Sequence, residues 1–113
     1  MKNKKIVMVL GSPGGQRIIT STLLTILNVL DYHFNIQAAV DAPRFHHQWM
    51  PDVIEIEPNV FTESTIKKMI EMGYHFSPHD RWGAVEAIDI DPATKVIYGG
   101  SDDRRLVGKA VGY

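Results

Sequence analysis

Apolar side chains recur along the chain in patterns that predict both strands and helices. Residues 5–10 form an apolar run between lysines and a glycine-rich turn, which is typical of a strand covered on both faces. Residues 16–31 repeat apolar side chains at helical spacing on more than one side, which predicts a helix buried on several sides. Residues 53–57 alternate between apolar and acidic side chains, which predicts a strand.

Two shorter helices are indicated by the residues at their ends. A helix over residues 36–41 is predicted because Asn35 is a favoured N-terminal capping residue. A helix over residues 62–72 is predicted because Thr62 can cap its start. Gly73 suits the left-handed residue that closes such a helix.

The remaining segments predict a loop, a short strand and a hairpin. Residues 43–51 are polar and aromatic without a clear period, so we expect a structured loop there, and residues 74–76 suggest a short strand. Residues 84–91 and 95–99 predict two paired strands joined by a turn at residues 91–94. Both faces of this hairpin carry apolar residues, so the sheet requires a cover on each side.

Composition limits the class of protein. The 113 residues, of which 44% are apolar and 22% charged, are typical of one globular domain, so we expect residues 1–113 to form a single domain. The net charge of −1 gives no electrostatic attraction to nucleic acid or to an anionic membrane. The chain has no cysteine, which excludes disulfides, thiolate metal sites and a cysteine nucleophile.

The first residues resemble the start of an export signal, with lysines before an apolar run. The run over residues 6–10 is shorter than the roughly 7–15 apolar residues that such a signal needs. No apolar run approaches the roughly 20 residues of a membrane-spanning helix. We therefore expect a cytoplasmic location for this chain as given.

The segment with the strongest candidate chemistry is the turn over residues 11–15, Gly-Ser-Pro-Gly-Gly, between a predicted strand and a predicted helix. Two successive backbone amides in such a turn can point at one oxygen atom, as an oxyanion hole requires. The same glycines also suit an ordinary tight turn, and both interpretations stay open on composition alone. The segment is not a P-loop, because Gln16 and Arg17 stand where a lysine and a hydroxyl residue are needed.

Other reactive residue types form weaker patterns. The histidines do not have metal-ligand spacing, and adjacent histidines on an extended segment point in opposite directions. A triad nucleophile stays open, although no nucleophile-elbow motif is present. The charged run over residues 102–105 suits either a site for an acidic substrate group or a solvated or self-paired surface turn. The histidines and serines concerned are His33, His46, His47, His75 and His79, and Ser12, Ser21, Ser64, Ser77 and Ser101.

Several blocks together resemble the γ-glutamyltransferase family, also called γ-glutamyltranspeptidase or glutathione hydrolase. They occur in the order found in that family and cover nearly the whole chain. The blocks are residues 9–18, 42–49, 82–88, 98–102 and 108–113.

This resemblance implies an α+β fold, namely part of the αββα sandwich of N-terminal nucleophile hydrolases, with helices packed on a mostly antiparallel sheet. It implies a precursor that cuts itself to expose a threonine nucleophile. That threonine takes a γ-glutamyl group from a donor such as glutathione and passes it to water or an amino acid. Gly14 and Gly15 match the family's glycine pair, whose backbone N–H groups form the oxyanion hole.

The departures from the family are equally informative. The family's threonine nucleophile and its substrate-binding residues precede the region covered here, so no residue is assigned as nucleophile or to substrate binding. The resemblance implies no cofactor and no metal. Asp103 stands where we expect a proline after Ser101 and Asp102.

The leading hypothesis is a C-terminal piece of a γ-glutamyltransferase small subunit that is inactive alone. A donor such as glutathione is then a partner only when the rest of the enzyme is present. The alternative is a non-catalytic interaction or anion-binding module that pairs with a separately encoded catalytic half. In either case an uncovered apolar sheet face predicts a homodimer or another partner chain.

Overall fold

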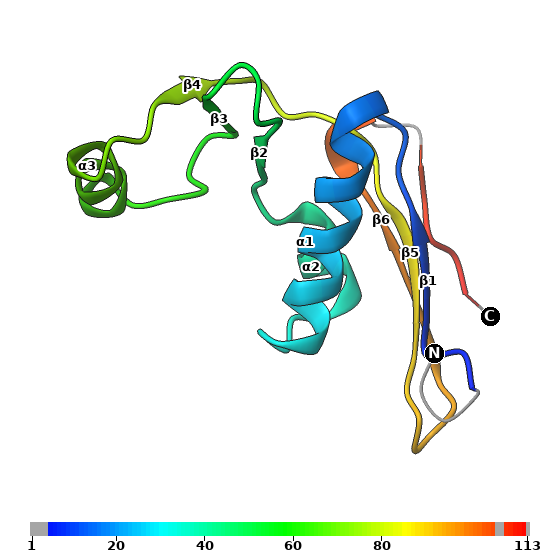
Figure 1. Ribbon diagram of the computed structural model, residues 1–113. Helices are drawn as coiled ribbons and strands as arrows, with labels where there is room; N and C mark the ends of the chain where they lie inside the picture. The colour runs from blue at the N-terminus through cyan, green and yellow to red at the C-terminus, as the bar shows by residue number, and fades with distance from the viewer. Residues whose placement is uncertain (1–4, 106–107, 113) are drawn as a thin grey trace. The chain divides into compact units, whose positions relative to one another are not determined.

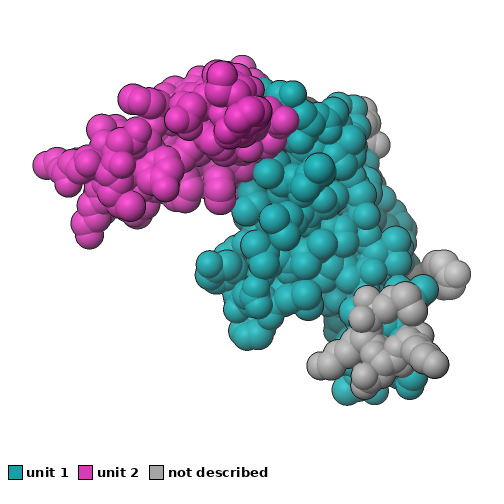
Figure 2. Space-filling view, in the orientation of Figure 1, with its two compact units in different colours: residues 1–42, 83–113 teal, residues 43–82 magenta. Residues whose placement is uncertain are grey.

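The computed structural model describes residues 5–105 and 108–112, and the chain divides into two compact units. Residues 1–42 and 83–113 form the first unit and residues 43–82 the second, as Figure 2 shows in two colours. The expectation of a single domain over the whole chain stays a prediction. No described helix is both long and apolar enough to cross a membrane.

The first unit contains an antiparallel sheet with the strand order β1-β5-β6, together with two helices (Figure 1). A 3-10 turn over Gly15–Arg17 connects β1 to the first helix. The elements of this unit are β1 (Met8–Gly11), α1 (Ile18–Leu30), α2 (Ile36–Asp41), β5 (Glu86–Ile90) and β6 (Ile97–Ser101).

Helix α2 packs on one face of this sheet. Ile36 and Val40 of α2 lie in one buried cluster with Val85 and Ala87. The helix approaches so closely that a Cβ added at Gly100 would lie 3.0 Å from the Ile36 carbonyl oxygen. Glycine in β6 therefore sets the distance between helix and sheet.

The Gly100→Ala variant is expected to lower the free energy of unfolding by about 1–3 kcal/mol, because the two atoms nearest to the added methyl group are backbone atoms of Ile36, which cannot move aside as the end of a flexible side chain could. The matched control is Gly112→Ala, since nothing lies within 4 Å of a Cβ added there. Urea unfolding of both variants measures the difference. Equal stability of the two variants would contradict the close packing at Gly100.

The opposite face of the sheet is covered in part by residues 108–112 (Figure 1). Successive residues of a strand point to opposite faces, and a Cβ added at Gly99 would lie 2.8 Å from the Ala110 Cβ. Ile88 pairs with Gly99 on one side and with Val9 on the other, so the three residues share one face. We call the face that carries Val9, Ile88 and Ile97 the outer sheet face.

Burial in β1 and α1 differs from the sequence-based expectation. Val9 in the middle of β1 is 54% exposed, and Ile19 of α1 is 74% exposed. The residues of α1 that are fully buried are Ser21 and Thr25. The expectation that both elements are covered on several sides is therefore wrong for this chain by itself. The physical reason is that the unit covers each element from one side, and the other apolar side chains face outward.

The second unit contains the mixed sheet β2-β3-β4 and helix α3, with β2 antiparallel and β4 parallel to β3 (Figure 1). The expectation of a loop throughout residues 43–51 is wrong, because β2 forms within that range by pairing with β3. The strand expected at residues 74–76 lies slightly later. The bounds are β2 (Phe45–His47), β3 (Ile54–Ile56), α3 (Glu63–Glu71) and β4 (Phe76–Pro78).

The local signals for helix ends and for the hairpin turn are confirmed. The side chains of Asn35 and Thr62 accept hydrogen bonds from backbone N–H groups in the first turns of α2 and α3. Gly73 closes α3 with a φ of 98°. In the β5–β6 turn, the N–H groups of Thr94 and Ala93 donate to Asp91, which holds the pKa of that carboxyl below its usual value.

Candidate functional site

The glycine loop, residues 11–15, leaves β1 and enters the 3-10 turn before α1. Gly14 has a φ of 141° and Gly15 a φ of 56°, a region of backbone conformation that strains any residue with a side chain. The turn is closed by the N–H of Arg17, which donates to the Gly14 carbonyl at 3.1 Å, and by the N–H of Ile18, which donates to the Gly15 carbonyl. The turn therefore uses the glycine carbonyls and not the glycine amides.

A serine hydroxyl connects the glycine loop to the segment before β5. The Oγ of Ser12 donates to the Pro13 carbonyl at 2.8 Å and accepts from the N–H of Ala84 at 3.3 Å. A Cβ added at Gly14 would lie 3.9 Å from the Gly83 Cα. Both of these partners of Ser12 are backbone groups. Neither is a base that could activate its hydroxyl as a nucleophile.

Asp102 and Arg104 form a buried ion pair beside the same segment. Their side chains are almost fully buried, and Asp102 Oδ1 lies 2.9 Å from Arg104 Nη1. Asp102 Oδ2 also accepts from the Val85 N–H at 2.9 Å, while Arg104 donates to the carbonyls of Val40 and Ala42 at the end of α2. Within the charged run at residues 102–105, Asp102 and Arg104 therefore pair with each other, as the self-paired interpretation expected. The expectation of a surface turn is wrong for these two residues, because both side chains are buried.

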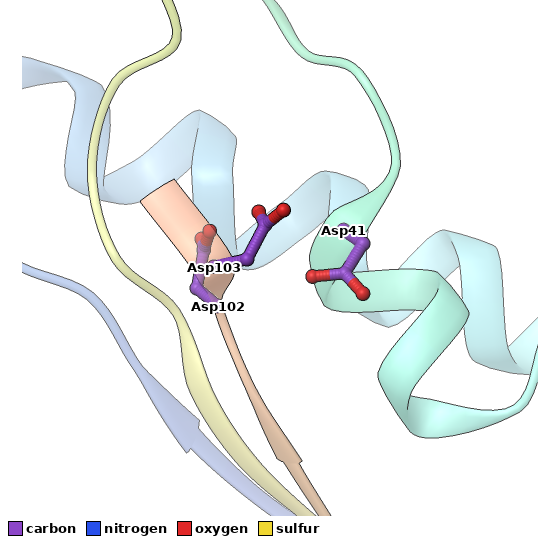
Figure 3. A group of neighbouring side chains, drawn as sticks. All are labelled: Asp41, Asp102 and Asp103. Carbon is purple, nitrogen blue, oxygen red and sulfur yellow. The ribbon is translucent and has the colours of Figure 1, made fainter. Parts of the chain in front are cut away.

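Three carboxylates gather at this place, as Figure 3 shows. Oxygen atoms of Asp41, Asp102 and Asp103 lie within 4.8 Å of one another. Asp41 Oδ2 accepts from Gln37 Nε2 at 2.8 Å, and Arg104 already supplies a positive charge to Asp102. These contacts occupy one oxygen of Asp41 and pair Asp102 with a cation, while Asp41 Oδ1 is buried without a hydrogen-bond partner among the described residues.

The adjacent histidines of β2 point to opposite sides, as their extended backbone predicted. His46 is 3% exposed, and its Nε2 lies 3.0 Å from Gln48 Oε1. His47 is exposed, and its Nε2 lies 3.0 Å from Asp52 Oδ1. The ring Nδ1 of His47 also accepts from the N–H of Trp49. The two rings therefore do not converge on one ligand position.

A buried polar network in the second unit was missed by the sequence reasoning. Glu57, which is 1% exposed, accepts from the N–H of Trp82 at 2.9 Å and from the N–H of Arg44 at 3.0 Å. Arg44, also 1% exposed, donates to the Trp82 carbonyl at 2.9 Å. The available signal was that Arg44 and Trp82 fall in two of the family-like blocks, yet nothing in the sequence connects either residue with Glu57.

The Glu57→Gln variant is expected to lower the free energy of unfolding by about 1–3 kcal/mol, because the amide keeps one acceptor where the carboxylate provides two to buried N–H groups. The control Glu63→Gln changes an exposed residue in the first turn of α3 and is expected to shift stability by less than about 1 kcal/mol. Chemical unfolding measures both. A Glu57→Gln variant as stable as the control would show that the network contributes little.

The helices and sheets of this chain are those of part of an N-terminal nucleophile hydrolase, an α+β class. The sequence profile of γ-glutamyltranspeptidase matches residues 1–113. This chain therefore belongs to the γ-glutamyltranspeptidase family.

Individual relatives agree with this assignment. The glutathione hydrolase proenzyme of a Pseudomonas species is 43% identical over an aligned length of 120 residues. The alignment covers 99% of this chain and 21% of that protein. The Escherichia coli glutathione hydrolase proenzyme is 38% identical over 113 residues, which cover 100% of this chain and 19% of that protein. A mutant Helicobacter pylori γ-glutamyltranspeptidase structure has a TM-score of 0.86 at 46% identity and covers 92% of this chain.

The chain thus spans about a fifth of the length of these curated relatives, and 57% of the Helicobacter pylori chain. These 113 residues correspond to one part of the family's enzymes. The assignment of Gly14 and Gly15 to an oxyanion hole stays a prediction at this point.

Proposed function

We propose that these 113 residues supply the oxyanion hole of a γ-glutamyltransferase through the backbone N–H groups of Gly14 and Gly15. The observation that carries this proposal is the bonding of the 3-10 turn, whose donors are Arg17 and Ile18. The hydrogen bonds that close this turn therefore do not use the N–H groups of Gly14 and Gly15 as donors. Both glycines are exposed, so a substrate oxygen can reach them.

In γ-glutamyl transfer, a nucleophile attacks the γ-carbonyl carbon of a glutathione-like donor. The carbonyl oxygen then becomes negatively charged. Two N–H groups fixed before the reaction stabilise this charge without reorganisation, which is how an oxyanion hole accelerates acyl transfer. The intermediate collapses and breaks the donor's amide bond, and the amine leaves with a proton. The γ-glutamyl group, now on the nucleophile, then passes to water or to an amino acid. In our proposal the threonine nucleophile comes from polypeptide outside these 113 residues, because acyl transfer needs an activated nucleophile.

The test is complementation with a relative. The chain is co-expressed with the Escherichia coli glutathione hydrolase proenzyme from which the aligned segment of 113 residues has been deleted. We expect release of the anilide from a γ-glutamyl anilide by the combined halves, and none above background by either half alone. Turnover by the isolated chain that survives the Ser12→Ala substitution would contradict the proposal, as would a combined pair that folds together but stays inactive.

The second candidate is a non-catalytic module whose apolar surface binds another chain, and exposed apolar residues favour it. Val9, Ile88 and Ile97 of the outer sheet face are 54%, 43% and 66% exposed. Contiguous exposed apolar surface is uncommon on monomers and marks interfaces. The simplest occupant of this face in a pure sample is a second copy of the chain, related by a two-fold axis.

The isolated chain is therefore expected to form dimers at tens of micromolar, with a mass twice the 12.7 kDa of one chain. The Ile88→Lys variant is expected to shift the equilibrium to monomer, because dimerisation would bury its charge in an apolar interface. The control Met72→Lys alters a residue that is 73% exposed in the other unit. Sedimentation measures the masses, and a folded wild-type monomer at this concentration would refute self-association.

A further inference from the structure

We propose that Ser12 is a positioning residue, whose hydroxyl holds the glycine loop so that the Gly14 and Gly15 amides keep one orientation. The catalytic consequence of this inference rests on the proposed function. The structural part concerns the order of the loop and is measurable in the isolated chain.

The Ser12 hydroxyl joins two segments that are 72 positions apart in the sequence. It donates to the carbonyl of Pro13, which lies immediately before the glycine pair, and accepts from the N–H of Ala84. The first bond restrains the Pro13 carbonyl, and the second attaches the Ser12 side chain to the segment before β5. Ser12 thereby connects the residue that precedes the glycine pair to a distant segment of the same unit.

The segment that receives Ser12 is itself held firmly. Ala84 is 8% exposed and Val85 is 0% exposed. The N–H of Val85 donates to the buried carboxylate of Asp102 at 2.9 Å, and the N–H of Asp102 donates to the Val85 carbonyl at 3.1 Å. Two consecutive amides, those of Ala84 and Val85, thus donate to side chains of different segments, Ser12 and Asp102. The attachment point of Ser12 is therefore buried and fixed independently of the loop.

The glycine loop needs such an attachment because packing holds it weakly. Nothing lies within 4 Å of a Cβ added at Gly15, and the nearest atom to one added at Gly14 is the Gly83 Cα at 3.9 Å. Glycine has the largest backbone freedom of any residue, so two in succession favour several loop conformations. Oxyanion stabilisation requires donors that are fixed before the charge develops. A hydroxyl that links the loop to the buried segment before β5 supplies this restraint.

The experiment compares two variants of equal shape, Ser12→Thr and Ser12→Val, which differ by a hydroxyl in place of a methyl group. In the isolated chain labelled with ¹⁵N, the heteronuclear NOE reports the order of each backbone amide. We expect values at Gly14 and Gly15 near wild type in Ser12→Thr and clearly lower in Ser12→Val. The control Ser64→Ala removes a hydroxyl that contacts Thr62 beside α3 and should leave both glycines unchanged.

Equal glycine NOE values in the two Ser12 variants would overturn the inference. Ser12→Ala offers the same comparison against wild type if a β-branched side chain at this position prevents folding. In the complemented enzyme, Ser12→Ala is expected to lower kcat about 10-fold with KM unchanged, because it loosens donors that act on the transition state. If wild type shows no turnover, the proposed function fails, while the NOE comparison still decides the role of Ser12.

Discussion

The Asp102→Ala variant is expected to lose about 3–5 kcal/mol of folding free energy, because it leaves the Arg104 guanidinium buried without its carboxylate. Asp102 Oδ2 also accepts from the Val85 N–H, so the substitution leaves a buried donor unsatisfied at the start of the hairpin. Arg104 donates to carbonyls at the end of α2, so the loss should also loosen the contact between that helix and the sheet.

The measurement for Asp102 is urea unfolding followed by circular dichroism. The control is Asp103→Ala, the exposed neighbour, which is expected to change stability by less than about 1 kcal/mol. If Asp102→Ala is unfolded without urea, Asp102→Asn provides a milder comparison, since its amide can still accept one hydrogen bond. An Asp102→Ala variant as stable as Asp103→Ala would show that the buried pair contributes nothing to stability.

The Gly15→Ala variant of the complemented enzyme is expected to lose on the order of 10²-fold in kcat. Alanine disfavours the φ of 56° at this position, so the loop relaxes and one N–H leaves the oxyanion; losing one such donor costs about 10²–10³-fold in other enzymes. KM should change little, because the interaction is made in the transition state.

The matched control for this variant is Gly73→Ala. Gly73 also has a positive φ, 98°, and nothing lies within 4 Å of a Cβ added there, but it closes α3 in the other unit. The control therefore reproduces the backbone strain without touching the glycine loop. If both variants lose kcat equally, the effect is one of stability, and the oxyanion role of Gly15 is not supported.

The elements that the sequence predicted well are those fixed by neighbouring residues. Asn35 and Thr62 cap helices by bonding to N–H groups three positions later, and Asp91 organises the hairpin turn in the same local way. Such contacts depend on short spacing alone, so residue type and order suffice to predict them.

The elements that it missed depend on distant partners. Strand β2 has three residues without a hydrophobic period, and it is a strand because β3 pairs with it. The buried pairing of Glu57 with the Arg44 and Trp82 amides joins segments 13 and 25 positions away. No periodicity connects such residues, because only the tertiary fold brings them together.

The same division applies to the candidate site. The sequence by itself determined the family, since contiguous blocks of residues carry it, and the oxyanion role that it predicts for Gly14 and Gly15 stays a prediction. Only the tertiary structure decided that Ser12 meets Ala84 and that Asp102 meets Val85, because hydrogen bonds over 72 and 17 positions require the chain to return to the same place. The tertiary structure also decided which apolar side chains stay exposed, because a side chain is buried only where another part of the chain packs against it.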